Sequence, residues 1–306
     1  MLSQKPFVCP PELLKKAQTS RPLATAVAGA ASPLPMESAR RSAEAGLIEP
    51  ILVGNQKSIG AIAEEMSWDV SNLRIISADG ETVAAETAVA LARSGEAAAV
   101  MKGQVHTDVL MRAVFNRDTG LRIGRRISHV FHMTIPERTG SLLITDAAVN
   151  VSPDVATKLD IIRNAVDVLH ALGNTKPKVA ILSATEQANE SVPSSIAAAE
   201  VSRLAGDQIS DALIDGPLAF DNAMSPEAAA IKGIDSPVAG QADMLLVPNI
   251  ETGNTLYKSM VFLMSATAAG IVVGARVPVI LTSRADPPEA RLASAALAAI
   301  VSQYQG

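Results

Sequence analysis

The stretch LLITDAAVNVSPDVATKLDIIRNAVDVLHAL, residues 142–172, places a short apolar run, a polar loop and a long amphipathic segment in succession. In the last of these, apolar residues recur at helical spacing at Val155, Leu159, Ile162, Val166 and Leu169. This spacing predicts one long helix packed on a sheet, with Pro153 in its first turn and Asp154 at its positive end. A strand, a loop and a helix in this order are the repeating unit of a parallel α/β sheet.

The same alternation runs along the rest of the chain. Short apolar runs bounded by Gly, Asp, Ser or Pro predict strands at Ile51–Val53, Leu73–Ile76, Ala98–Met101, Val130–Met133, Leu142–Thr145, Val179–Leu182, Ala212–Ile214, Met244–Val247, Ile271–Val273 and Val279–Thr282. The apolar stretch Leu23–Ala31 resembles a first strand more than the core of a signal peptide. We therefore expect an α/β protein with mainly parallel sheets.

Length and composition exclude several classes of protein. With 306 residues, 48% of them apolar and 19% charged, the chain is long enough for two domains and too apolar to be disordered. Its net charge of −5 and 3% aromatic residues give no general basis for nucleic-acid binding. The uncharged run Ser259–Ala275 is too short to span a membrane, and we interpret it as the end of a buried helix followed by a buried strand.

The single cysteine, Cys9, excludes an internal disulfide. A lone cysteine in a chain of this length is typical of a reducing compartment, so we expect a cytoplasmic protein.

The segment PVILTSRADPPEAR, residues 278–291, is the most informative for chemistry. A buried strand here ends in Thr282, Ser283 and Arg284 just before a helix. Ligands of α/β sheets bind beyond the carboxyl ends of strands, where a serine hydroxyl and an arginine can hold phosphate oxygens. Asp286 is the expected N-cap, with Pro287 at the first helical position and Glu289 completing a capping box. The alternative is an ordinary capped loop with a solvated arginine.

A second candidate is a basic stretch, which could bind a phosphorylated ligand or could equally be a solvated helix face or a subunit contact. It contains Arg112, Arg117, Arg122, Arg125 and Arg126 and is followed by His129 and His132. Those two histidines alternate with apolar residues on an expected strand, where a structural role is common. The chain has no zinc-site spacing, no P-loop, no standard dinucleotide-binding glycine motif and no G-x-S-x-G elbow, so we expect no metal site.

Three further segments, each near the end of an expected strand, carry more polar residues than packing requires. They are LITDAAVN with Asp146 and Asn150, IDGPLAFDNAMS with Asp215, Asp221 and Asn222, and SPVAGQADMLLVPNIETGNTLYK with Asn249, Asn254, Tyr257 and Lys258. Turn chemistry alone also explains Asp, Asn, Gly and Pro at such places.

Taken together, these segments resemble the phosphate acetyltransferase and phosphate butyryltransferase family. The resemblance runs from about Gly46 to the C-terminus through AVMKGQVHTD, RRISHVFHM, LLITDAAVNVSPD, ALIDGPLAFDNAMS, SPVAGQADMLLVPNIETGNTLYK and GARVPVILTSRAD, in family order. The D-G-P-L-x-F-D and I-E-x-G-N-x-L-Y-K forms are similar to the butyryltransferase-like branch.

The resemblance implies two parallel-sheet α/β domains of the isocitrate/isopropylmalate dehydrogenase-like type around a central cleft, and a homodimer. It also implies reversible transfer of an acetyl or butyryl group between coenzyme A and inorganic phosphate, with no prosthetic group and no membrane or nucleic-acid partner. We expect the first domain at residues 1–139 plus 277–306 and the second at 140–276, with the boundary near PERTG, residues 136–140.

By the same resemblance, the family's Ser-Arg pair corresponds to Ser283 and Arg284. The proposed base of the acetyltransferases does not carry over cleanly, because the equivalent stretch reads Asp286, Pro287, Pro288, Glu289 and Ala290. Both carboxylates are candidates, and we favour Asp286. We expect substrate binding by Arg112, Asp221, Asn254 and Lys258.

Two other functions remain open at this point. A non-catalytic acyl-CoA binding or sensing protein on the same scaffold would not need the Ser-Arg pair. A dehydrogenase of the related two-domain fold would need a metal-binding aspartate cluster, which the sequence does not show.

Overall fold

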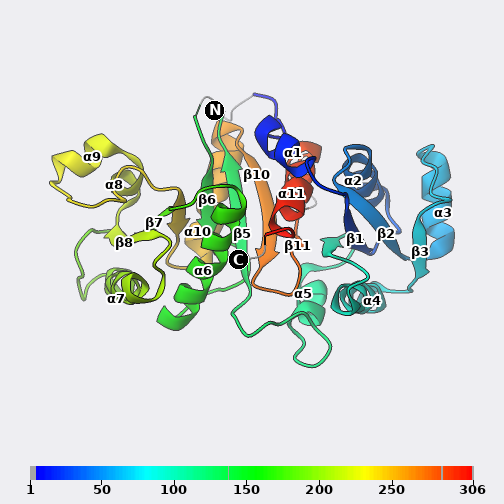
Figure 1. Ribbon diagram of the computed structural model, residues 1–306, viewed down its shortest axis with the longest axis horizontal. Helices are drawn as coiled ribbons and strands as arrows, with labels where there is room; N and C mark the ends of the chain where they lie inside the picture. The colour runs from blue at the N-terminus through cyan, green and yellow to red at the C-terminus, as the bar shows by residue number, and fades with distance from the viewer. Residues whose placement is uncertain (1–4, 137, 284, 305–306) are drawn as a thin grey trace. The chain divides into compact units, whose positions relative to one another are not determined.

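The computed structural model describes residues 5–136, 138–283 and 285–304 (Figure 1). The chain divides into two compact units. We call residues 7–125 and 269–303 the flanking unit and residues 126–268 the central unit, after their places in the sequence. These limits differ from the boundaries after residues 139 and 276 that we expected, and that domain division stays a prediction. The expected boundary at residues 136–140 falls, in sequence, between β5 and β6 and within the range of the central unit.

The flanking unit is built on strands in the order β3-β2-β1-β4-β11-β10. The bounds are β1 Leu23–Ala28, β2 Ile48–Gly54, β3 Arg74–Ser77, β4 Ala99–Lys102, β10 Thr267–Val273 and β11 Val279–Ile280. All neighbouring pairs are parallel except β10 with β11, and the division between the units falls inside β10. Its helices are α1 Pro11–Ala17, α2 Pro33–Glu44, α3 Gln56–Glu65, α4 Glu81–Ser94, α5 Thr107–Phe115 and α11 Pro288–Val301.

The central unit has strands in the order β5-β6-β9-β7-β8, parallel except for the pair β5 and β6. The bounds are β5 Ser128–Thr134, β6 Leu142–Thr145, β7 Lys178–Leu182, β8 Leu213–Leu218 and β9 Met244–Leu246. Its helices are α6 Val155–Ala171, α7 Pro193–Gln208, α8 Phe220–Met224, α9 Pro226–Ile231 and α10 Ile250–Met264. The pair β5 and β6 is antiparallel because the connection between them is too short in sequence for a crossover helix.

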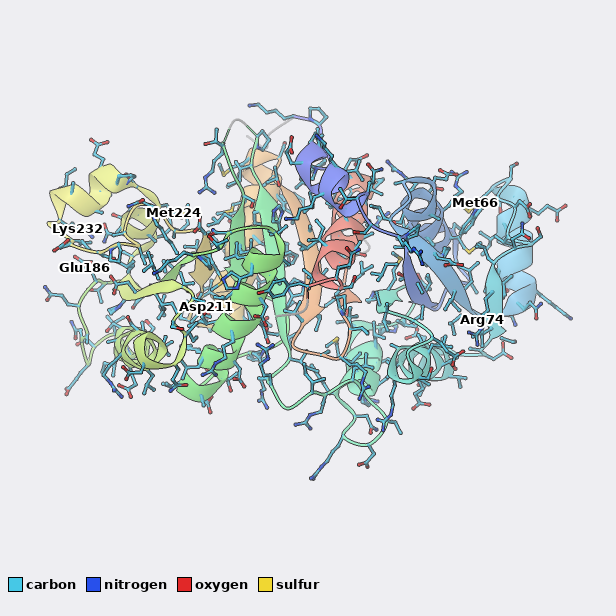
Figure 2. All side chains as sticks on the ribbon, in the orientation of Figure 1. Met66, Arg74, Glu186, Asp211, Met224 and Lys232 are labelled. Carbon is cyan, nitrogen blue, oxygen red and sulfur yellow. The ribbon has the colours of Figure 1, made fainter. Side chains whose placement is uncertain are left out.

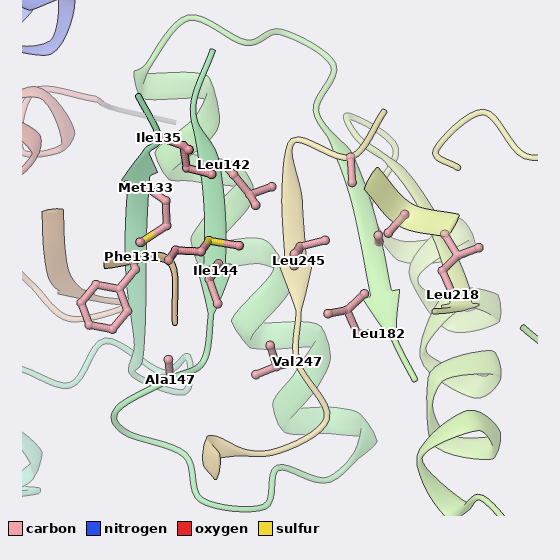
Figure 3. Close-up of a cluster of buried hydrophobic side chains, with 14 of the residues drawn as sticks. Phe131, Met133, Ile135, Leu142, Ile144, Ala147, Leu182, Leu218, Leu245 and Val247 are labelled. Carbon is pink, nitrogen blue, oxygen red and sulfur yellow. The ribbon is translucent and has the colours of Figure 1, made fainter. Parts of the chain in front are cut away.

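The core of the central unit lies between its strands and α10. Phe131, Ile144 and Leu245 come from β5, β6 and β9 and meet Met260 of α10 in one cluster of buried side chains. Figure 3 shows how side chains from neighbouring strands gather in this layer. Gly253 lets α10 approach, because a Cβ there would lie 2.8 Å from the Cβ of Ala147.

The long helix α6 is confirmed, and it packs against β5, β6 and β9. The carboxylate of Asp154 caps it by accepting from the backbone N–H of Thr157 at 2.8 Å. Pro153 precedes this cap, so our expectation that it sits in the first turn is wrong. The reason is that Asp154 has an extended backbone and the helix begins one residue later.

The fold expected from the sequence is confirmed as mainly parallel α/β. Each expected strand coincides with an observed one to within a few residues at its ends, and Leu23–Ala28 is indeed the first strand. The uncharged run Ser259–Ala275 contains the end of α10 and all of β10, and the strand is buried as expected, whereas the end of the helix is exposed at Phe262, Leu263 and Met264. None of the helices in the described ranges is long and apolar enough to cross a membrane.

Candidate active site

Ser283 follows the short strand β11 at the carboxyl edge of the flanking sheet. Because β11 runs parallel to β4, with Val279 opposite Val100 and Ile280 opposite Met101, the two chains leave the sheet side by side. Strand β4 ends at Lys102 and continues into Gly103 and Gln104, and β11 continues through Leu281 into Thr282 and Ser283. Parallel pairing therefore sets these two short segments next to each other.

A shallow hollow, open to solvent, lies between these segments and two helices. It is lined by Leu34, Pro35, Ser38, Lys102, Gly103, Gln104, Thr282, Ser283 and Arg291, all in the flanking unit. We call it the Ser283 hollow. Among the described residues that line it, two are basic and none has a carboxylate, although the chain as a whole carries a net charge of −5. The charge of the hollow therefore suits an anionic ligand, and the hydroxyl group meant to contact that ligand is the one of Ser283.

Asp286 is tied to Ser283 through the backbone. Its carboxylate Oδ2 accepts a hydrogen bond from the Ser283 N–H at 2.6 Å, and its own N–H donates to the Ser283 carbonyl at 3.2 Å. The Ala285 N–H adds a contact of 3.3 Å to the Ser283 hydroxyl oxygen. Ser283 and Asp286, two of the three predicted catalytic residues, thus lie together. The third, Arg284, lies outside the described residues.

The predicted capping box at the start of α11 is wrong. The helix begins at Pro288 with Pro287 as its N-cap, and no side chain caps it. The ring of Pro288 disfavours helical backbone angles at Pro287, which stays extended with ψ at 155°. Asp286 is therefore one residue too early to cap, and Glu289 instead lies 3.5 Å from the guanidinium of Arg41.

Sequence reasoning missed Lys102 and Arg291. Arg291 lies in the first turns of α11, and its Nη2 donates to the backbone carbonyl of Asp286. Burial lowers the pKa of its guanidinium below the ordinary value, and the charge of Asp286 opposes this effect. The position of Lys102 at the end of an apolar strand, in the quoted segment AVMKGQVHTD, was the available signal for the lysine.

The basic stretch does not form one compact cluster of buried charge. Arg112 lies on α5 with its side chain 79% exposed, and its Nη2 is 3.7 Å from the Asp108 carboxylate one turn earlier. Arg117 and Arg122 are also exposed. A role for Arg112 in substrate binding stays a prediction.

The other three predicted substrate-binding residues belong to the central unit. Asn254 and Lys258 lie one turn apart on α10, and the Lys258 ammonium is 6.0 Å from the centroid of the Tyr257 ring. Asp221 is on α8, 4.0 Å from the ammonium of Lys232, which also contacts the Glu186 carboxylate at 3.4 Å. Figure 2 shows Lys232 and Glu186 close to each other.

Asp146, which the sequence singled out, is a buried structural carboxylate. It accepts hydrogen bonds from the backbone N–H groups of His129, Ala148, Val149 and Asn150 and from the Asn150 side chain. Its burial is thus offset by five donors, which fix the loop after β6. Asn150 also donates to the carbonyl of Ile127.

His129 and His132 are buried on β5. Burial lowers the pKa of each imidazole from 6.5 to about 4, and the nearby Asp146 charge opposes this at His129. Both rings are therefore neutral near pH 7. His129 lies edge-on to Phe131, with ring centroids 4.3 Å apart. Within the described ranges, no group of three His, Cys, Asp or Glu side chains could hold a metal ion.

Residues 81–299 match the family described as "Phosphate acetyl/butaryl transferase". The chain belongs to this family. A phosphate acetyltransferase of Rhizobium meliloti is 48% identical over 94% of this chain and 92% of its own length. A phosphate butyryltransferase of Clostridium acetobutylicum is 40% identical over 95% of this chain and 97% of its own length. These comparisons confirm the family, while placement near its butyryltransferase-like branch stays a prediction.

Solved structures agree with the family and with the fold. A branched-chain phosphotransacylase from Enterococcus faecalis V583 has a TM-score of 0.80 and 32% identity, covering 92% of this chain and all of that one. A 4-hydroxythreonine-4-phosphate dehydrogenase from Klebsiella pneumoniae, 13% identical, has a TM-score of 0.58 over 92% of this chain and 100% of its own. The second similarity concerns the fold alone, and it confirms the expected dehydrogenase-like type.

The buried histidines predict a pH dependence of stability. His129 and His132 have a pKa of about 4 in the folded chain but an ordinary value near 6.5 when unfolded. Between these values only the unfolded chain takes up the protons, so acid favours unfolding. We expect the free energy of unfolding to fall between pH 6.5 and 5, by at most about 1.4 kcal/mol per pH unit for each histidine. Urea unfolding at several pH values measures it.

In this pH window most carboxylates remain ionised, so the histidines dominate the slope. His132→Gln should flatten the dependence, because it removes one of the two buried imidazoles. A free energy of unfolding that stays constant from pH 6.5 to 5 would contradict the assignment.

Proposed function

We propose that this member of the phosphate acetyl/butyryl transferase family is an acyltransferase that moves a short acyl group, acetyl or butyryl, reversibly between coenzyme A and inorganic phosphate. The observation that carries the proposal is Ser283 in a hollow whose described lining residues include two basic side chains and no carboxylate. Relatives with 40% to 48% identity over most of the chain are named phosphate acetyltransferases and butyryltransferases. This favours catalysis over acyl-CoA binding without turnover.

In the proposed reaction the thiolate of coenzyme A attacks the carbonyl carbon of the acyl phosphate. A C–S bond forms, the bond from the carbonyl carbon to the phosphate oxygen breaks, and phosphate leaves with the electron pair. We assign phosphate binding to Arg284 and a hydrogen bond to the thiol or the developing oxyanion to Ser283. Arg112, Asp221, Asn254 and Lys258 remain our candidates for further substrate contacts. The reaction requires no redox step and no prosthetic group.

Order-of-magnitude comparison indicates that positioning of the substrates contributes more to the rate than the strength of the general base. A thiol with a pKa near 8.5 is already a few per cent ionised at neutral pH, so full deprotonation is worth about one to two powers of ten. Holding the reacting atoms in line is worth as much as ~7–11 kcal/mol, and stabilisation of the phosphate charge adds to this. The groups around Ser283 therefore matter more than the identity of the base.

Of the two candidate bases, we propose Asp286. Its carboxylate contacts the backbone of Ser283, whereas the carboxylate of Glu289 is directed to Arg41.

We also propose a homodimer in the cytoplasm. Phe262, Leu263 and Met264 at the end of α10 are each about half exposed, and a contiguous exposed apolar segment is typical of an interface. The lone Cys9 supports a reducing compartment.

Sedimentation velocity tests the dimer. Leu263→Lys should shift the measured mass toward that of one chain, and a wild-type protein with the mass of one chain would refute the dimer.

Phosphate-dependent release of coenzyme A tests the function directly. Acetyl-CoA and butyryl-CoA are incubated in parallel with and without phosphate, and the free thiol is measured. We expect phosphate-dependent release from at least one of them, and binding without turnover of either would instead support the acyl-CoA sensing protein.

Arg284→Ala should lower kcat/KM by at least about a hundredfold, because a charged hydrogen bond to phosphate is lost. Steady-state kinetics with varied phosphate measures the effect. Arg74→Ala is the control, since Arg74 contacts Glu96 at the surface of the same unit. Near-normal turnover of the Arg284 variant would remove this residue from the mechanism.

Asp286→Asn and Glu289→Gln separate a base from a structural carboxylate. A variant that lacks the general base should have a kcat lower by about 10²–10⁴, and this loss should shrink as the pH rises and the thiol ionises unaided. We expect this pattern for Asp286→Asn only, read from pH–rate profiles between pH 6 and 9. Wild-type profiles for both variants would exclude both carboxylates as the base.

A further inference from the structure

A histidine–glutamate pair lies at the carboxyl edge of the flanking sheet, and the proposed reaction leaves it without a role. His106 follows β4 and Glu81 begins α4, so the two residues are 25 positions apart in sequence. The His106 Nδ1 lies 2.7 Å and 3.0 Å from the two carboxylate oxygens of Glu81. The same carboxylate accepts from the His106 backbone N–H at 2.8 Å. One carboxylate thus holds the imidazole in a fixed orientation.

These contacts also fix the tautomer of the imidazole. A carboxylate offers only acceptors, so the hydrogen of the neutral ring is on Nδ1 and the lone pair is on Nε2. The Nε2 atom makes no hydrogen bond with the described part of the chain, and the side chain of His106 is 65% exposed. If Nε2 takes up a proton, the Glu81 carboxylate compensates the new charge. A carboxylate that orients an imidazole in this way is the arrangement of a general base.

His106 borders the Ser283 hollow. The segments that follow β4 and β11 leave the sheet side by side, because Ile280 is paired with Met101. Gln104, two residues before His106, lines the hollow, and Val105 between them is fully buried. Two residues of extended chain span at most about 7 Å. The imidazole is therefore within reach of a ligand that extends beyond the hollow.

One proton of the proposed reaction has no assigned acceptor. Asp286 is our candidate for the proton of the thiol, but near neutral pH inorganic phosphate also carries a proton on oxygen. This proton must leave when phosphate becomes an acyl phosphate. In the opposite direction the departing phosphate must gain a proton, because the fully deprotonated trianion is a strong base and a poor leaving group. A group that accepts and returns a proton is therefore needed at the phosphate.

We propose that His106 is a catalytic residue that exchanges this proton through Nε2, with Glu81 as its positioning residue. As a phosphate oxygen attacks the thioester carbonyl carbon, a C–O bond forms and the C–S bond breaks. The thiolate of coenzyme A leaves with the electron pair, and the phosphate proton passes to Nε2. In the opposite direction the imidazolium returns the proton to the departing phosphate. The proposal rests on the proposed function for the identity of the substrates.

Amide variants test both residues. His106→Gln keeps a polar side chain that cannot exchange a proton, so kcat should fall by about 10²–10⁴ with a smaller change in KM. His170→Gln is its control, because His170 is on α6 and does not line the hollow. Glu81→Gln should lower kcat about 10- to 100-fold, as expected for loss of an orienting carboxylate. Glu86→Gln, at an exposed glutamate of the same helix, should not.

Chemical rescue separates proton exchange from a structural role. His106→Ala leaves space at an exposed position, so added imidazole should recover part of the lost rate. A histidine that only supports the fold would show no such recovery. Wild-type kcat in His106→Gln, or an alanine variant of low kcat that imidazole does not rescue, would overturn the proposal.

The pH dependence shows which proton His106 exchanges. The loss in Asp286→Asn should shrink as the pH rises, because the thiol ionises unaided. The loss in His106→Gln should stay constant between pH 7 and 9, because the last proton of phosphate dissociates only in strongly alkaline solution. A loss in His106→Gln that shrinks in parallel with that of Asp286→Asn would assign His106 to the thiol and refute its role at the phosphate.

Nitrogen NMR of protein with ¹⁵N-labelled histidine makes the test independent of turnover. The His106 signals, assigned by their absence in His106→Gln, should show hydrogen on Nδ1, and inorganic phosphate should shift the Nε2 signal. Hydrogen on Nε2 in the neutral ring would contradict the proposal. If phosphate shifts Nε2 but no coenzyme A is released from either acyl-CoA, the histidine site stands and the proposed function fails. If turnover is normal and phosphate leaves Nε2 unchanged, the function stands and the histidine site fails.

Discussion

Parallel pairing of β11 with β4 is the constraint on which the candidate active site depends. Ile280 lies opposite Met101, so the residues that follow both strands leave the sheet at the same edge. β4 is itself paired in parallel with β1, with Lys102 opposite Ala28. The carboxyl ends of three strands, distant in sequence, are thereby aligned, and Ser283 and Lys102 meet at one hollow without any long-range contact between their side chains being needed.

Much of the fold could be predicted because its signals are local. Short runs of Val, Ile and Leu bounded by Gly, Asp or Pro gave strands, and the spacing of apolar residues in α6 gave its buried face. The order of the strands was beyond such patterns, because pairing partners are chosen by packing across the sheet. The start of α11 was misplaced because two successive prolines compete for the first helical position.

The candidate site was only half predictable for a related reason. Ser283 was recognisable because a strand end, a hydroxyl and a following helix occur within a few residues. Lys102 and Arg291 acquire meaning only when β4 and α11 are brought to the same hollow, which no local pattern reveals. Asp146 shows the converse, since its polar neighbours suggested a ligand-binding loop but five hydrogen bonds within the loop and from β5 account for it.

The discontinuity of the flanking unit also governs when the hollow can form during synthesis. β11 fills the place between β4 and β10, and α11 packs against α1 and α2, so the last forty residues complete a sheet begun by the first hundred. The residues of the central unit are contiguous and leave the ribosome earlier. Ser283 and Arg291 therefore reach Lys102 only when nearly the whole chain has emerged, so the hollow cannot form in a nascent or truncated chain that lacks its final helix.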